Sequence, residues 1–230
     1  MIKNIALVHG AWADGSGWQE VHDILTAKGF NVTIVPNPNT SLADDVRITN
    51  AVLSLQHGPT VLVGHSYGGA VISEAGGHPN VNALVYVAAF VLDAGESLFK
   101  MLKDASPDPN SPILPPKDGF IWLDRAKFHA NFCADVPAAT AKFMADSQVP
   151  VGLAAFETDL TVAAWKTKKS WYVVATEDKM IPPDAERGMA KRINAQVTEI
   201  KASHAVYISH ASEVANVIQK AAELKVLEPA

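Results

Sequence analysis

The sequence predicts an α/β fold: a mostly parallel sheet with helices on both faces and a small lid insertion. Three observations support this prediction. Short β-branched runs alternate with helical patterns through the first ninety or so residues, the alternation stops between about residues 91 and 165, and it then resumes. We therefore expect a single domain over residues 1–230, with a core at about 1–90 and 166–230 and a lid at about 91–165.

The strands of the first half are short runs rich in β-branched and apolar residues. They are expected at Ile2 to Val8, Asn31 to Val35, Thr60 to Val63 and Val81 to Ala88. Apolar residues recur at helical spacing between these runs, which predicts helices at Gly17 to Lys28, Ser41 to Gln56 and Tyr67 to Gly76. Ser41 is a suitable N-cap for the second of these helices.

The middle of the chain lacks this order. It carries scattered aromatic residues and prolines at positions 107, 109, 112, 115 and 116, without clear alternation of strand and helix. The last part again predicts strands and helices in turn: a strand at Trp171 to Thr176, a helix at Asp184 to Ile193, a strand at Gln196 to Ile200 and a helix at His210 to Ala222. A core interrupted by a lid fits this layout.

Composition narrows the class of protein. The chain of 230 residues is 48% hydrophobic and 19% charged, as in globular proteins, and its formal net charge of −5 argues against a nucleic-acid partner. The longest apolar run, Ala83 to Leu92, is about half of what spans a bilayer, so we expect no membrane partner and a soluble, cytoplasmic protein. The single cysteine, Cys133, cannot form an internal disulfide. The oligomeric state stays open.

The segment G-H-S-Y-G, Gly64 to Gly68, matches the pattern G-x-S-x-G between a predicted strand and a predicted helix. In that context the glycines allow a sharp turn that exposes the serine hydroxyl. Ser66 is therefore the candidate nucleophile. The backbone N–H of Tyr67, which starts the following helix, is expected to point to where an oxyanion would form.

A serine nucleophile needs a base, and the base needs an orienting acid. His204 follows the last predicted strand and should lie at the carboxyl edge of the sheet, whereas its nearest rival, His210, begins the closing helix. Asp178 follows the strand that ends at Thr176, with Glu177 as the alternative acid. The resulting order of serine, aspartate and histidine is that of one fold family.

The glycine-rich loop His9 to Gly17, after the first strand, is expected to supply a second oxyanion donor. It does not fit a nucleotide site, because the spacing of its glycines departs from both the phosphate-loop and the dinucleotide patterns. The histidines are dispersed and paired cysteines are absent, so neither a metal nor another cofactor is expected.

These residues resemble the α/β-hydrolase superfamily, through L-V-H-G-A-W, G-H-S-Y-G-G, E-D-K-M-I-P and S-H-A. The last two, with the small lid, resemble the branch of plant methyl-ester esterases, hydroxynitrile lyases and bacterial small esterases. The resemblance implies that the oxyanion donors are the N–H groups of Ala11 and Tyr67. It also implies that a lyase would carry threonine at position 10 and lysine at position 205, where this chain has Gly10 and Ala205.

We therefore expect a carboxylesterase-like serine hydrolase that cleaves small or aryl esters through an acyl-enzyme. The aromatic lid suggests a pocket lined by Trp12, Trp122, Phe128, Phe132, Phe143 and Met144. Three alternatives remain open at this stage: a slow-turnover ligand receptor of the same fold, a cofactor-free perhydrolase and, less favoured by Gly10 and Ala205, a hydroxynitrile lyase.

Overall fold

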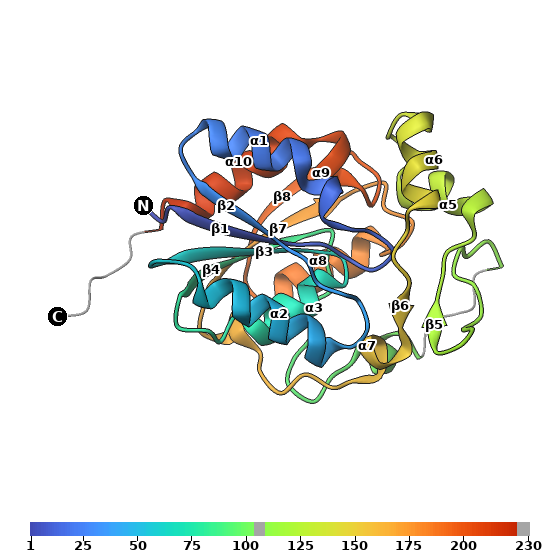
Figure 1. Ribbon diagram of the computed structural model, residues 1–230, viewed down its shortest axis with the longest axis horizontal. Coiled ribbons are helices and arrows are strands. Elements are labelled where there is room, and N and C mark those ends of the chain that lie inside the picture. Colours follow the sequence, from blue (N-terminus) through green and yellow to red (C-terminus); the bar gives the residue numbers. More distant parts are fainter. Residues whose placement is uncertain (104–108, 225–230) are drawn as a thin grey trace.

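A computed structural model describes residues 1–103 and 109–224 of the chain, and its centre is a six-stranded sheet (Figure 1). The strands are β1 (Asn4–Val8), β2 (Asn31–Val35), β3 (Thr60–His65), β4 (Val81–Val87), β7 (Lys169–Ala175) and β8 (Gln196–Ile200). Their order is β2-β1-β3-β4-β7-β8, and every neighbouring pair is parallel. The predicted α/β class is confirmed.

Burial of the strands follows their place in the sheet. Every residue of β1 and β3 is buried, whereas the edge strands β2 and β8 are partly exposed. Strands that are covered on both faces consist of nearly continuous apolar residues. The sequence therefore predicts the central strands clearly. The order of the strands reverses between β1 and β3, and ligand sites of open α/β sheets lie at such a switch point.

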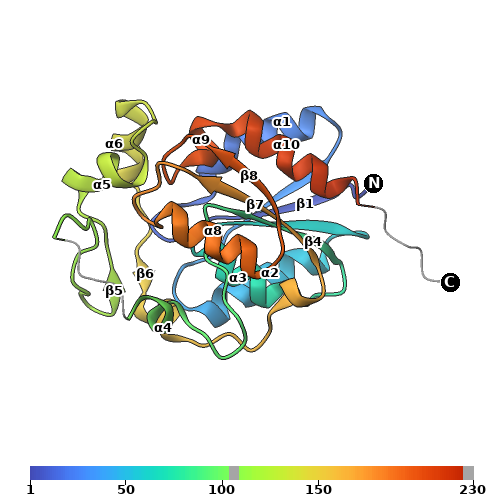
Figure 2. The ribbon, with the colours of Figure 1, turned by 180° about the vertical axis from the view of Figure 1, so that it is seen from behind.

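Helices cover both faces of the sheet. On one side lie α1 (Gln19–Ala27), α9 (Val206–Ser209) and α10 (Ala211–Ala222), and on the other lie α2 (Leu42–Ser54), α3 (Gly68–Ala75) and α8 (Pro183–Arg192) (Figures 1 and 2). Ser41 caps α2 as expected, because its hydroxyl accepts a hydrogen bond from the backbone N–H of Asp44.

The observed elements differ from the expected ones mainly at helix starts. The helix expected from Gly17 begins instead with a 3₁₀ turn, η1 (Gly15–Trp18), which the side chain of Asp14 caps. The helix expected from His210 is preceded by the short α9, which the sequence did not indicate. A turn of four residues is too short to leave a recognisable apolar period.

The inserted segment (residues 91–165) contains more regular structure than the sequence suggested. Its elements are α4 (Leu98–Leu102), β5 (Phe120–Ile121), α5 (Arg125–Phe132), α6 (Ala138–Asp146), β6 (Val151–Gly152) and α7 (Leu153–Glu157), and the 3₁₀ turn η2 (Ala164–Lys166) ends it. Residues 104–108, including Pro107, lie outside the described ranges. The β5–β6 pair joins residues about thirty apart, and such non-local pairing is not visible in local patterns.

The inserted segment lies beyond the carboxyl ends of the strands, as its green and yellow elements show in Figure 1. Among the contacts that tie it to the core, the N–H of Gly152 donates to the carbonyl of Asn39 at 2.8 Å, and the N–H of Ala205 donates to the carbonyl of Phe132 at 3.0 Å. Within the described ranges, no helix is both long and apolar enough to cross a bilayer.

Candidate active site

Ser66 lies in the sharp turn between β3 and α3, and its φ of 54° places it in the left-handed region. Hydrogen bonds hold the turn from both sides: the N–H of Ser66 donates to Val87 and its carbonyl accepts from Phe90. Gly64 is required here, because a Cβ at this position would lie 2.4 Å from the carbonyl oxygen of Gly68. The turn thus holds Ser66 in a conformation that non-glycine residues rarely adopt.

Ser66, His204 and Asp178 form one line of hydrogen bonds. The Oγ of Ser66 lies 2.9 Å from Nε2 of His204, and Nδ1 of His204 lies 2.6 Å from Oδ2 of Asp178. The second carboxylate oxygen of Asp178 accepts from the N–H groups of Met180 and Ile181 at 2.6 and 2.9 Å. The carboxylate is therefore fixed by backbone donors while it orients the imidazole.

His65 and Phe132 hold His204 from behind. Nε2 of His65 donates to the carbonyl of His204 at 2.9 Å, and the two imidazole rings lie 4.6 Å apart. The ring of Phe132 meets His204 edge-on at 4.9 Å. Burial and the neighbouring His204 lower the pKa of His65, which keeps it neutral at pH 7. Nothing in the sequence singled out His65 for this supporting role, which depends on the contact of two residues 139 positions apart.

Glu186 is a second buried carboxyl group behind Asp178. Its Oε2 accepts from the N–H of Ala175 at 3.1 Å, and its carboxyl group lies near enough to feel the charge of Asp178. Burial, together with the charge of Asp178, raises the pKa of Glu186 far above its usual range. Glu186 is thus a neutral acid at pH 7. It lies on the polar helix α8, and the sequence gives no sign that its side chain is buried.

Ala11 and Tyr67, the residues expected to supply the oxyanion donors, both line the cavity in front of Ser66. Within the described part of the chain, neither N–H donates to a protein acceptor. The loop of Ala11 approaches Ser66 closely, since a Cβ on Gly10 would lie 2.7 Å from the Cβ of Ser66. A threonine at position 10, as in the lyases of the resembled branch, would not fit here without a shift.

A buried carboxylate lies below this loop. Asp45, on α2, accepts from the hydroxyl of Tyr67 at 2.6 Å and from the N–H of Asn39 at 2.8 Å, and it is fully buried. Burial raises the pKa of Asp45 to about 6. Burial and the nearby Asp45 also raise the pKa of the Tyr67 hydroxyl, which therefore stays protonated and donates.

The cavity in front of Ser66 encloses about 100 Å³. Core loops and the inserted segment both contribute to its wall: Ala11, Trp12, Ser66, Tyr67, Phe90, Leu102, Ile113, Phe156, Met180 and Ile181. None of these lining residues carries a charge. The wall therefore suits an uncharged, largely apolar ligand.

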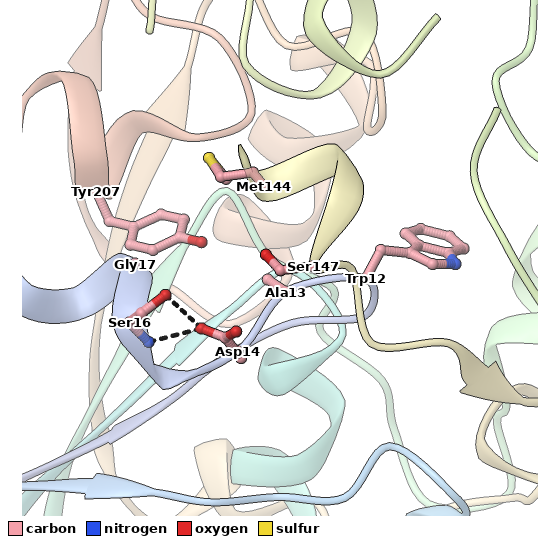
Figure 3. Close-up of a pocket in the computed structure, with 8 residues that line it drawn as sticks. All are labelled: Trp12, Ala13, Asp14, Ser16, Gly17, Met144, Ser147 and Tyr207. Atoms are coloured by element: carbon pink, nitrogen blue, oxygen red, sulfur yellow. Dashed lines mark hydrogen bonds between the residues drawn. The ribbon is translucent and has the colours of Figure 1, made fainter. Parts of the chain in front are cut away.

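Of the six aromatic and methionine residues expected in the pocket, only Trp12 lines this cavity. Its indole donates to the carbonyl of Ile121 in β5 at 3.0 Å and meets the ring of Phe156 edge-on. Met144 instead borders a separate hollow of about 20 Å³ with Asp14 and Tyr207, and in Figure 3 the indole of Trp12 points away from these residues. The expectation for Met144 was therefore wrong.

The other four expected lining residues are also corrected. Phe128 and Phe132 are fully buried and stack on each other, with Phe132 packed against His204 rather than against the cavity. Trp122 is half-buried on the β5 side of the segment without bordering the cavity, and Phe143 is 63% exposed. Aromatic content alone cannot distinguish a ligand wall from packing, because both require burial.

The rival candidates lie away from Ser66. His210 contacts Ser209 and Asp135, and Glu177 pairs with Lys201 at 3.6 Å on the surface. Cys133 is buried, and burial next to Asp135 raises the pKa of its thiol to about 12, which suppresses the nucleophilic thiolate.

Comparison with known families identifies the chain. Residues 5–217 match the model of the family described as "Alpha/beta hydrolase family". The protein belongs to the α/β-hydrolases. The match spans both β1 and most of α10, so it includes all the strands and the whole inserted segment.

The curated relatives of this α/β-hydrolase include ester-cleaving enzymes. It is 28% identical over 197 residues to the carbendazim hydrolyzing esterase of a Nocardioides species (strain SG-4G), covering 76% of this chain and 80% of the relative. It is also 28% identical over 246 residues to a pyrethroid hydrolase of Sphingobium wenxiniae, covering 94% of this chain and 86% of the relative.

Solved structures share the fold. A pyrethroid hydrolase from Sphingobium faniae JZ-2 superposes with a TM-score of 0.82 at 23% identity, covering 97% of this chain and 98% of the other. Polyneuridine aldehyde esterase superposes with a TM-score of 0.82 at 18% identity, covering 96% and 99%. The predicted resemblance to the α/β-hydrolases, including plant esterases of this type, is confirmed at the level of the fold.

Proposed function

We propose that this α/β-hydrolase is a serine esterase that cleaves neutral, largely apolar carboxylic esters through an acyl-enzyme. The observation that carries the proposal is the unbroken line of hydrogen bonds from Ser66 through His204 to Asp178, with Ser66 in the wall of a cavity whose described lining residues carry no charge. The curated relatives named as an esterase and a hydrolase support the same reaction class.

In the first step, Oγ of Ser66 attacks the ester carbonyl carbon while Nε2 of His204 takes the hydroxyl proton. The carbonyl oxygen becomes an oxyanion that the N–H groups of Ala11 and Tyr67 stabilise. The bond to the leaving alkoxide then breaks, His204 returns its proton to that oxygen, and the acyl group stays on Ser66. Asp178 stabilises the imidazolium that forms between the two proton transfers.

In the second step, His204 takes a proton from water, and the resulting hydroxide attacks the acyl carbon. The second oxyanion forms between the same two N–H groups. Its collapse breaks the bond to Oγ, His204 protonates Ser66, and the carboxylic acid leaves. This cycle needs neither a metal nor an organic cofactor.

The cavity wall defines the substrate class. With about 100 Å³ and no charge among its described lining residues, it favours a small aliphatic or aryl acyl group over one that carries a carboxylate. The Gly10 and Ala205 positions favour hydrolysis over cyanide release, because neither side chain can hold a cyanohydrin hydroxyl or stabilise a leaving anion.

The test compares wild type with Ser66→Ala on p-nitrophenyl acetate, butyrate, benzoate and hemisuccinate. We expect kcat/KM to fall by at least about a thousandfold in the variant and wild type to prefer the neutral esters over the charged hemisuccinate. Ser54→Ala, on the exposed part of α2, is the matched control. Equal, slow hydrolysis by wild type and Ser66→Ala would refute the proposal.

The remaining alternatives are separated by two further measurements. A fluorophosphonate should add to Ser66, as located by peptide mass, and addition elsewhere would contradict the assignment of the nucleophile. Stoichiometric release of p-nitrophenol without turnover would favour a slow receptor. Faster transfer of the acyl group to hydrogen peroxide than to water would favour a perhydrolase.

A further inference from the structure

A buried hydrogen-bonded chain connects the two segments that carry the candidate oxyanion donors, and the reaction described above does not use it. Its centre is Asp45 on α2, an element that carries neither donor. Asp45 forms no ion pair within the described ranges, and its two carboxylate oxygens bond in different directions. A buried carboxylate without a cation is costly, so its retention calls for a role.

One carboxylate oxygen of Asp45 reaches Tyr67, in the turn before α3. Oδ2 accepts from the hydroxyl of Tyr67 at 2.6 Å, and Tyr67, which lines the cavity with Ser66, carries one of the two candidate donor N–H groups. The ring of Tyr67 also lies 6.1 Å from that of Phe156 in the cavity wall. The hydrogen bond of its hydroxyl therefore fixes the side chain of Tyr67, the N-cap residue of α3.

The other carboxylate oxygen of Asp45 is connected through Asn39 to the loop that contains Gly10 and Ala11. Oδ1 accepts from the N–H of Asn39, and Nδ2 of Asn39 donates to the carbonyl of Gly10 at 3.2 Å. Nδ1 of His9 donates to the same carbonyl at 3.0 Å. Asn39 is itself held by Nδ2 of Asn37, which donates to its side-chain oxygen at 2.9 Å.

The carbonyl of Gly10 and the N–H of Ala11 belong to one peptide group. Because the peptide is planar and trans, its C=O and N–H point in opposite directions. Two donors on the oxygen therefore fix the direction of the N–H on the other side. They also polarise the peptide, which makes that N–H a stronger donor.

We propose that Asp45 is a positioning residue that sets the two oxyanion donors, the N–H groups of Ala11 and Tyr67, at a fixed distance from each other. The inference rests on the proposed esterase function. An oxyanion hole requires its donors to be held within about 0.5 Å of the productive geometry, and here they lie on two separate loops. Asp45 is the group whose two oxygens join these loops.

The experiment uses Tyr67→Phe, Asp45→Ala and Asp45→Asn in the full-length protein, with kcat and KM measured on p-nitrophenyl butyrate. Tyr67→Phe removes one hydroxyl and keeps the ring in the cavity wall. We expect Tyr67→Phe and Asp45→Ala to lower kcat on the order of 10- to 100-fold, less than the full loss of a donor, with KM changed by less than about threefold.

Asp45→Asn removes the negative charge of the carboxylate but keeps a side chain that can bond to both Asn39 and Tyr67. Its amide oxygen can accept from the N–H of Asn39, and its NH₂ can donate to the Tyr67 oxygen. We expect this conservative variant to recover most of the kcat lost in Asp45→Ala. A kcat for Asp45→Asn as low as that of Asp45→Ala would overturn the bridging role.

A second measurement tests the oxyanion hole alone. A trifluoromethyl ketone adds Oγ of Ser66 to its carbonyl carbon, passes the serine proton to His204 and places an oxyanion between the two donors. The matching methyl ketone binds without a stable oxyanion. In Tyr67→Phe and Asp45→Ala, affinity for the trifluoromethyl ketone should fall in proportion to kcat, while methyl ketone affinity stays within about twofold.

Equal loss of affinity for both ketones, or a kcat within twofold of wild type in both variants, would overturn the inference while leaving the esterase intact. If Asp45→Ala does not fold, Tyr67→Phe carries the test, because it removes a single oxygen. Absence of Ser66-dependent turnover in wild type would instead refute the proposed function, and this inference with it.

Discussion

At the scale of the residue, the buried carboxyl of Asp45 should make stability depend on pH. Its pKa rises from 3.8 to about 6 because burial disfavours the charged form. Only well below pH 3.8 is the group protonated in both the folded and the unfolded protein, where it has no effect. Above about pH 6 it is ionised in both, and the folded state bears the cost of the buried charge.

Asp45→Asn removes this titration, and we expect a specific difference between the two proteins. The free energy of unfolding of wild type, relative to Asp45→Asn, should fall by about 2 kcal/mol as pH rises from 4 to 7. Urea unfolding followed by circular dichroism at pH 4, 5, 6 and 7 measures it. Asp44→Asn, a half-buried neighbour whose carboxyl pKa is lowered rather than raised by its hydrogen bonds to Ser41 and Thr40, is the control and should not reproduce this fall. A constant difference across this range would contradict the assignment of the shift to Asp45.

At the scale of the residue, the sequence located the positions that a motif or the order of the chain marks. The G-x-S-x-G pattern led to Ser66, and chain order led to Asp178 and His204, which the structure brings within hydrogen-bond distance of one another. Asp45 and Glu186 could not be found this way. Each is an acidic residue on a polar-looking helix, and only the packing of that helix buries it.

At the scale of the element, the short helix α7 shapes the cavity. Phe156 projects from α7 into the wall, where its ring contacts those of Trp12 and Tyr67. The sequence offered no reason to choose this phenylalanine over the others of the inserted segment. The choice depends on how α7 packs, since β6 immediately before it is joined to the core at Asn39.

Phe156→Ala should therefore enlarge the acyl site and change substrate preference. We expect the ratio of kcat/KM for p-nitrophenyl benzoate over acetate to rise about tenfold, the scale of one to two kcal/mol for altered apolar contacts. Phe143→Ala on the exposed face of α6 is the control for loss of an aromatic ring from the same segment. If both variants keep the wild-type ratio, Phe156 does not define the acyl site.

At the scale of the whole molecule, stability should be greatest in the middle of the sheet. Strands β3 and β4 are paired on both sides and almost fully buried, whereas β8 is an edge strand with three exposed residues among five. Amides open locally at a cost that grows with burial and pairing. The candidate nucleophile, at the end of β3, is thus attached to the most protected part of the fold.

Hydrogen exchange measured by mass spectrometry can check this order. Peptides from β3 and β4 should exchange at least about tenfold more slowly than the peptide that contains β8. Peptides from β2, the other edge strand, serve as the internal comparison and should resemble β8. Exchange from β8 as slow as from β3 would show that the edge is protected in a way its burial does not explain.

The sequence by itself determined the α/β class, the places of the six strands and the three residues aligned at the carboxyl edge. It could do so because strands and sharp turns leave local patterns, and because parallel strands bring their carboxyl ends to one edge. Tertiary structure decided the cavity wall, the neutral Glu186 behind Asp178 and the chain from Asp45 to the peptide of Ala11. Those features arise from contacts between residues distant in sequence, so their burial and charge state exist only once the chain is packed.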